Sequence, residues 1–67
     1  MIVETPLKFV YKNWKNETKE RTVVPIGVWH GKTEFHPEEQ WFLKARDLEK
    51  GEERDFALLD IQKFVKA

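Results

Sequence analysis

Several residue types that commonly stabilise or equip small proteins are missing from this chain of 67 residues. Cysteine is absent, which excludes disulfide bonds and thiolate metal sites. Serine is absent as well, and none of the four threonines is paired with a base, so nucleophilic catalysis is not expected. The three glycines stand apart at positions 27, 31 and 51, which excludes a glycine-rich phosphate loop. These absences predict a binding protein without a cofactor rather than an enzyme.

The sequence also has no excess of charge of either sign and no long apolar runs. Twelve basic and twelve acidic residues balance, with six bases against three acids in residues 1–33 and six against nine in residues 34–67. A strongly basic nucleic-acid-binding protein would differ, although a local basic pocket stays open. No apolar stretch approaches the length of a membrane span, and the first residues do not resemble a secretory signal. We expect a soluble, cytoplasmic protein that makes no membrane contact.

Aromatic residues are plentiful, with five Phe, three Trp and one Tyr. A chain of this size buries only about 60% of the surface that its unfolded form exposes, so its stability is marginal. Each aromatic side chain can bury roughly 150–250 Å². We therefore expect one domain over residues 1–67 with an aromatic core that includes Trp29, or a homodimer that hides some of the rings.

Alternation of apolar and polar side chains predicts strands at residues 7–12 and 41–48. We expect two further strands at residues 18–30, charged in the first half and apolar on both faces in the second, and at residues 53–58. Residues 13–17 fit a hairpin loop, in which an asparagine can adopt the left-handed conformation. Pro25 donates no hydrogen bond to a neighbouring strand and Gly27 weakens a strand, so we expect a bend or bulge there. Such a bend lets a small barrel turn a corner.

The remaining segments are less regular. Residues 30–40 form a long connection, in which Pro37 followed by two glutamates could begin a helical turn. Residues 49–52 predict a turn at Gly51. Residues 59–67 fit a short helix or a turn leading into a closing strand, and we favour the strand. Together the segments predict an all-β or nearly all-β fold, a five-stranded antiparallel meander closed into a small SH3-like or Sm-like barrel.

Residues 9–13 and 20–28 resemble the opening of a WYL domain, with its aromatic-containing strand, short polar hairpin and Arg-x-Val-x-Pro-Leu/Ile stretch. Residues 41–43 are similar to the Trp-Tyr-Leu tripeptide of that family, with Phe42 in place of Tyr. Residues 51–61 resemble its turn, its Arg-x-Phe-Arg-Leu segment and the isoleucine that follows. The similarity covers roughly residues 7–61, which is most of the chain.

The resemblance implies an Sm-like barrel that senses nucleotides or nucleic acids through a basic, aromatic-lined pocket. Members of the family are usually joined to a helix-turn-helix domain in bacterial regulators, for which 67 residues leave no room. The connection between Gly31 and Trp41 is longer than the usual hairpin, and Ala57 and Asp60 stand where the family commonly has arginines. We expect a stand-alone, divergent relative, of a kind that would suit a phage or mobile-element accessory protein.

The candidate ligand site combines aromatic and basic residues. Alternation places Phe42, Lys44 and Arg46 on one face of a strand. Arg21 and Arg54 resemble the basic residues of the family and could converge on that face from neighbouring strands. Arginine forks bind phosphates and flat rings stack on bases, so the five residues would bind a nucleotide or a short single strand. The alternative is a solvated face, with both arginines paired to nearby acids, namely Glu20, Glu53 or Asp55.

Two other features invite a functional interpretation. The connection holds two histidines and three glutamates that could ligate zinc or iron, namely His30, Glu34, His36, Glu38 and Glu39. The histidine spacing matches no established motif, so we favour a structural loop without metal. Trp14, at the predicted hairpin tip, either contacts a partner or folds back over Tyr11.

Two hypotheses follow. The first is a regulatory WYL-like module that binds a nucleotide or nucleic acid, for which Arg21→Ala or Arg54→Ala should abolish binding and leave the fold intact. The second is a protein-interaction module that uses exposed aromatic residues and can self-associate as a homodimer. In that case Trp14→Ala should weaken the binding of the partner, and the arginine substitutions should not.

Overall fold

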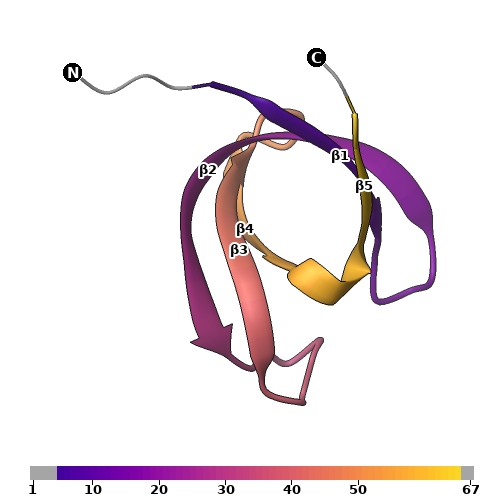
Figure 1. Cartoon of the computed structure of the whole chain (residues 1–67), viewed down its shortest axis with the longest axis vertical. Coiled ribbons are helices and arrows are strands. Elements are labelled where there is room, and N and C mark those ends of the chain that lie inside the picture. The colour runs from indigo at the N-terminus through magenta and orange to yellow at the C-terminus, as the bar shows by residue number, and fades with distance from the viewer. Residues whose placement is uncertain (1–4, 66–67) are drawn as a thin grey trace.

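Five antiparallel strands form one sheet in the computed structural model, which describes residues 5–65. The strands are β1 (Leu7–Lys12), β2 (Thr18–Gly31), β3 (Gln40–Asp47), β4 (Glu52–Ala57) and β5 (Ile61–Val65). The one helical element among the described residues is a 3-10 turn, η1 (Leu58–Asp60). The strands follow one another around a ring, so the sheet curls into a barrel (Figure 1). The predicted all-β, barrel-like fold is confirmed.

Strand β2 is long enough to serve both halves of the sheet. Its first half pairs with β1, and its second half pairs with β3. The register with β3 shifts between Pro25 and Gly27, where the sequence predicts a bend. Because β2 turns there, one continuous strand carries the sheet around the corner of the barrel.

Strands β1 to β4 form the predicted meander, but β5 does not continue it. The sheet order is β4-β3-β2-β1-β5, so β5 returns to pair with β1. The closing strand and the turn before it are thus confirmed over residues 58–65, and no α-helix forms among these residues. Residues 66–67, also part of that prediction, lie outside the described residues.

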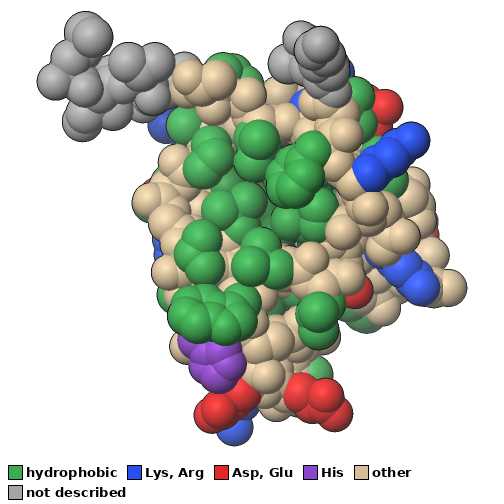
Figure 2. All heavy atoms as spheres, viewed as in Figure 1, with side chains coloured by type: hydrophobic (Ala, Val, Ile, Leu, Met, Phe, Trp, Pro, Cys, Tyr) green, Lys and Arg blue, Asp and Glu red, His purple; other side chains and the backbone are tan. Residues whose placement is uncertain are grey.

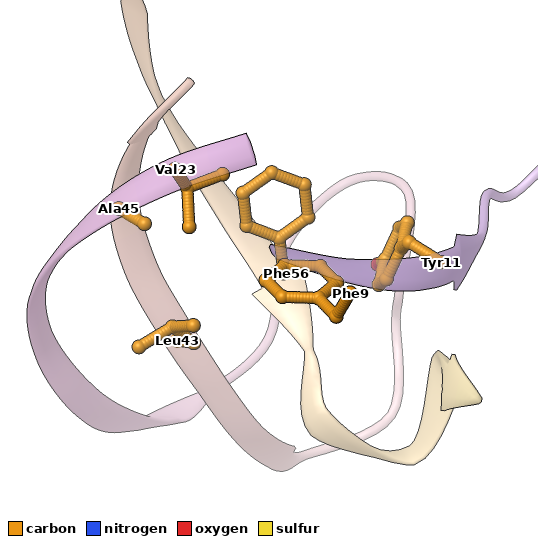
Figure 3. Close-up of a cluster of buried hydrophobic side chains, with 6 residues drawn as sticks. All are labelled: Phe9, Tyr11, Val23, Leu43, Ala45 and Phe56. Carbon is orange, nitrogen blue, oxygen red and sulfur yellow. The ribbon is translucent and has the colours of Figure 1, made fainter. Parts of the chain in front are cut away.

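The barrel is closed between β4 and β1 by a side chain. Tyr11 on β1 accepts a hydrogen bond at 2.9 Å through its hydroxyl from the backbone N–H of Ala57, the last residue of β4. The ring of Tyr11 also packs edge-to-face on Phe56, with ring centroids 5.0 Å apart. Both rings belong to the core cluster drawn in Figure 3, whose members are Phe9, Tyr11, Val23, Leu43, Ala45 and Phe56. Trp29 is not part of this cluster, contrary to the prediction.

The connections follow the predictions with one exception. Asn16 and Gly51 both have positive φ angles, of 67° and 68°, and support the two tight turns. The helical turn predicted at Pro37 is wrong. The hydroxyl of Thr33 accepts the backbone N–H groups of Phe35 and His36, and Thr33 and His36 also exchange two backbone hydrogen bonds. This local turn ends at the residue before Pro37, and no helix follows it.

The Tyr11 hydroxyl makes stability depend on alkaline pH. Burial raises the pKa of Tyr11 above its ordinary value of 10.0, and Asp60 adds to the rise, while the Ala57 hydrogen bond and Arg21 oppose it. Since the folded-state pKa exceeds the unfolded one, this contribution is complete below about pH 10 and is lost as the pH rises through the folded-state value. Urea unfolding should therefore show stability falling above about pH 10.

Tyr11→Phe provides the matched test, because it keeps the ring and removes only the hydroxyl. At neutral pH it should cost about 1–3 kcal/mol, since the buried N–H of Ala57 loses its acceptor. Its stability should fall less steeply above pH 10 than that of the wild type. An equal fall in both proteins would exclude Tyr11 as the titrating group.

Candidate functional site

The two faces of the curled sheet differ, and the strand register assigns each residue to one of them. Residues directly opposite each other on paired strands share a face. Phe9 lies opposite Arg21 and Ala45 lies opposite Arg54, so both arginines share the inner face with the core. Asp47 lies opposite Val23 and is on the inner face too.

These three charged residues form a cluster at the edge of the core, the Asp47 cluster. Asp47 is completely buried, and its Oδ2 lies 3.4 Å from Nη1 of Arg21 and 3.9 Å from Nε of Arg54. Its Oδ1 accepts the backbone N–H groups of Glu49 and Lys50 at 3.0 and 3.3 Å. One carboxylate therefore joins β2, β3 and β4 and holds the turn between β3 and β4.

Arg21 and Arg54 have unequal freedom within the cluster. The side chain of Arg21 is 9% exposed, whereas that of Arg54 is 40% exposed and also donates to Glu52 at 3.0 Å. The Nε atom of each arginine is buried and has no hydrogen-bond partner among residues 5–65. Arg54 is thus the arginine that an incoming ligand can reach most easily.

The five candidate site residues do not share a face. Alternation along β3 sets Phe42, Lys44 and Arg46 against the inward Leu43 and Ala45, so they lie on the outer face. The two arginines lie on the inner face, as the register shows. The structure therefore brings Arg21 and Arg54 together and leaves the other three apart from them.

Phe42 is not available for stacking on a ligand. It is fully buried, with the ring of Trp29 stacked on it at 4.8 Å and the ring of His36 against it at 5.7 Å. The indole N–H of Trp29 donates to Asp55 at 2.8 Å, and Lys44 forms an ion pair with Asp55 at 3.7 Å. Alternation could not predict this burial, because the covering ring of His36 comes from the distant connection.

A pocket of about 500 Å³ lies along the free edge of β4. All five residues from Glu52 to Phe56 line the pocket, so residues from both faces of β4 contribute to it. Tyr11 and Arg21, from the inner face of the sheet, also line it. The backbone N–H of Ala57 points to Tyr11, away from β3. In an antiparallel ladder alternate residues point the same way, so the N–H and C=O groups of Glu53 and Asp55 also face this edge.

Two loops build the rim of this pocket. Trp14, from the hairpin loop, stacks on Phe35, from the connection between β2 and β3, with ring centroids 5.3 Å apart and an interplanar angle of 26°. Both rings are more than half exposed, and the ammonium group of Lys15 lies 5.3 Å from the Trp14 ring. Trp14 therefore stacks on Phe35 and keeps surface open to a ligand or a partner.

Hydrogen bonds hold both loops in place. Asn13 accepts the backbone N–H groups of Lys15 and Glu17 at 2.9 Å through its side chain, which orders the loop that carries Trp14. His36 contacts Asp60 at 3.0 Å and so ties the connection that carries Phe35 to η1. The rim of the pocket is thus organised without a ligand.

The candidate metal-ligand residues of the connection do not gather. Within residues 5–65, no group of three His, Cys, Asp or Glu side chains is placed to hold a metal ion. His36 instead contacts Asp60, and the ring of His30 packs against Trp41 at 5.1 Å.

Sequence reasoning missed Asp47 and Phe35 as parts of this region. Asp47 is in phase with Leu43 and Ala45 along β3, which is a signal that its carboxylate points inward and requires a cationic partner. Phe35 carried no such signal, because its position depends on how the connection folds.

A second exposed surface is apolar. Val28, Trp41 and Phe64 are each more than half exposed, and the register places all three on the inner side of the sheet, opposite Leu43, His30 and Phe9. We call these three residues the apolar surface. Figure 2 shows hydrophobic side chains gathered over the middle of one face of the molecule. No helix of the described residues is long and apolar enough to cross a membrane.

Asp47→Asn tests the structural role of the cluster. Removing one partner of a buried ion pair leaves an uncompensated charge and should cost about 3–5 kcal/mol, measured as a lower midpoint of urea unfolding. Glu53→Gln is the matched control, because it makes the same change at an exposed residue and should stay within about 0.5 kcal/mol of the wild type. Equal stability of both variants would contradict this role of Asp47.

Comparison with known proteins supports the sequence resemblance. A family model described as WYL domain matches residues 2–65, nearly the whole chain. No curated protein and no solved structure gave a match. Domains of this family are generally regulatory, ligand-binding modules rather than enzymes. The structure that the family model matches is an all-β barrel with a pocket beside two arginines that are paired with Asp47. Because the match extends over nearly the whole chain, it shows that the chain belongs to the WYL domain family.

Proposed function

We propose that this protein is a regulatory module that binds a nucleotide, or one nucleotide of a short single strand, in the pocket along β4. The observation that carries the proposal is the meeting of Arg21 and Arg54 beside a pocket whose rim is a pair of stacked rings. A guanidinium group is suited to a phosphate, and an aromatic ring is suited to a base.

The pocket offers a contact for each part of such a ligand. Its volume of about 500 Å³ falls within the usual range for small-molecule sites. Trp14 and Phe35 offer flat surfaces at the rim, and Arg54 offers a charged fork beside them. The N–H and C=O groups of Glu53 and Asp55 at the free edge offer donors and acceptors to the polar edge of a base. The five-residue site predicted from sequence is thereby replaced by one in which Phe42, Lys44 and Arg46 have no part.

The absence of an excess of basic residues also bears on the class of ligand. Two arginines and three carboxylates line the pocket, so it does not carry the electrostatic footprint of a double-stranded DNA binder. A small or single-stranded ligand, recognised by its ring as well as by its charge, fits this composition better. The protein would then regulate by sequestering its ligand or by docking on another protein.

The alternative function is a protein-interaction module. The apolar surface favours it, because exposed apolar patches often mark contacts with partners or with a second copy of the chain. Trp14 could take part in either function. Arg54 discriminates between the two, because it lines the pocket and is absent from the apolar surface.

A thermal-shift screen against nucleotides, cyclic dinucleotides and short oligonucleotides tests the proposal. A ligand at a hundred times its dissociation constant should stabilise the fold by about 2.7 kcal/mol. Arg54→Gln should weaken binding about 10- to 100-fold, because a hydrogen bond to a charged group contributes about 1.5–3 kcal/mol. Trp14→Ala should weaken it by a similar factor through the loss of stacking.

Arg46→Gln is the matched control, since Arg46 is exposed on the outer face and should not affect binding. Arg21→Ala is unsuitable as a test, because Arg21 is buried against Asp47 and its loss should unfold the protein rather than leave the fold intact. No shift with any compound, or equal losses in Arg46→Gln and Arg54→Gln, would contradict the proposal and favour the interaction module.

A further inference from the structure

One ion pair in the pocket is exposed and can be replaced. Arg54 donates through Nη2 to Oε1 of Glu52 at 3.0 Å, and the two side chains are 40% and 58% exposed. Asp47, the other anion beside Arg54, is fully buried and is held by two backbone N–H groups. Arg54 therefore pairs with one anion that stays in place, Asp47, and with one that can move away, Glu52.

We propose that the carboxylate of Glu52 occupies the place on Arg54 that a single phosphate of the ligand takes on binding. This inference rests on the proposed function and adds a regulatory contact and a ligand class to it. Glu52 acts as an internal competitor: it neutralises Arg54 in the free protein and moves aside for the ligand. An exposed ion pair of this kind contributes little to stability, so replacing it costs little free energy.

The nitrogen atoms of the two arginines differ in how well a phosphate can reach them. The Nε atoms of Arg21 and Arg54 are buried without a hydrogen-bond partner among the described residues, and both residues line the pocket. A phosphate in the place of Glu52 does not reach these buried atoms, of which Nε of Arg54 lies 3.9 Å from Oδ2 of Asp47. It accepts instead from Nη2 of Arg54, the donor that Glu52 releases, through a charge-assisted hydrogen bond.

The charges around the pocket limit the ligand to one phosphate. Arg21 is committed to Asp47, which leaves Arg54 as the accessible cation of the lining. Glu53 and Asp55 also line the pocket and would face any further phosphates. Asp55 is partly neutralised by Lys44, whereas Glu53 has no ion-pair partner among residues 5–65. A nucleoside monophosphate, or one nucleotide within a strand, fits this arrangement better than a nucleoside triphosphate.

Titration calorimetry of the full chain with AMP, ATP and an oligodeoxyadenylate of five nucleotides tests the inference. Glu52→Gln should bind AMP or the oligonucleotide about two- to fivefold more tightly than the wild type, in line with the strength of exposed ion pairs. Glu53→Gln makes the same change of charge at the neighbouring residue and should alter affinity much less. In an Arg54→Gln background, Glu52→Gln should not increase the affinity, since Glu52 then has no guanidinium group with which to pair.

The outcomes separate this inference from the proposed function. If the wild type binds a probe and Glu52→Gln gives no gain, or gives no more than Glu53→Gln, the competitor role is wrong and the proposed function stands. Tighter binding of ATP than of AMP overturns the limit to one phosphate. If no variant binds any probe, both proposals fall. Tighter binding of AMP than of the oligonucleotide identifies a free nucleotide as the ligand, and the reverse identifies a single strand.

Discussion

The burial of one carboxylate, that of Asp47, is the constraint on which the rest of this structure depends. A buried charge requires compensation, and Asp47 obtains it from Arg21, from Arg54 and from two backbone N–H groups of the following turn. These contacts join β2, β3 and β4 at the free edge of the sheet. They also leave Arg54 beside the pocket with part of its side chain exposed. Arg54 is therefore both a partner of the buried carboxylate and the candidate ligand-binding residue.

The unclosed edge of β4 is the second determinant. Because β5 pairs with β1 and not with β4, the barrel closes there through Tyr11 instead of a ladder of hydrogen bonds. The pocket lies along that edge, and the stacked rings of Trp14 and Phe35 lie over it from two loops. A small domain without disulfides can therefore offer a pocket without opening its core, which stays packed around Phe9 and Phe56.

The strands and the bend could be predicted because their signals are local. Alternation identifies β1 and β3, and Pro25 with Gly27 identifies the bulge in β2, since both depend on the backbone of the strand itself. The site was predicted less well. Alternation correctly separated Phe42 from Leu43, but the outward face of Phe42 is covered by Trp29 and His36. Such coverage depends on how the connection between β2 and β3 folds, for which Thr33 outweighed the helical signal of Pro37. The partners of the arginines likewise required the register between strands.

The three tryptophans report on three different surfaces, so their indole N–H signals in a ¹H–¹⁵N NMR titration with AMP or the oligonucleotide test the central claim most directly. Trp14 lies at the rim of the pocket, Trp29 covers Phe42 on the outer face, and Trp41 belongs to the apolar surface. Binding beside the Asp47 cluster predicts the largest change at Trp14 and the smallest at Trp41, together with a shift of the Arg54 backbone amide. The largest change at Trp41, with Trp14 unaffected, would contradict this account and move the ligand site to another face.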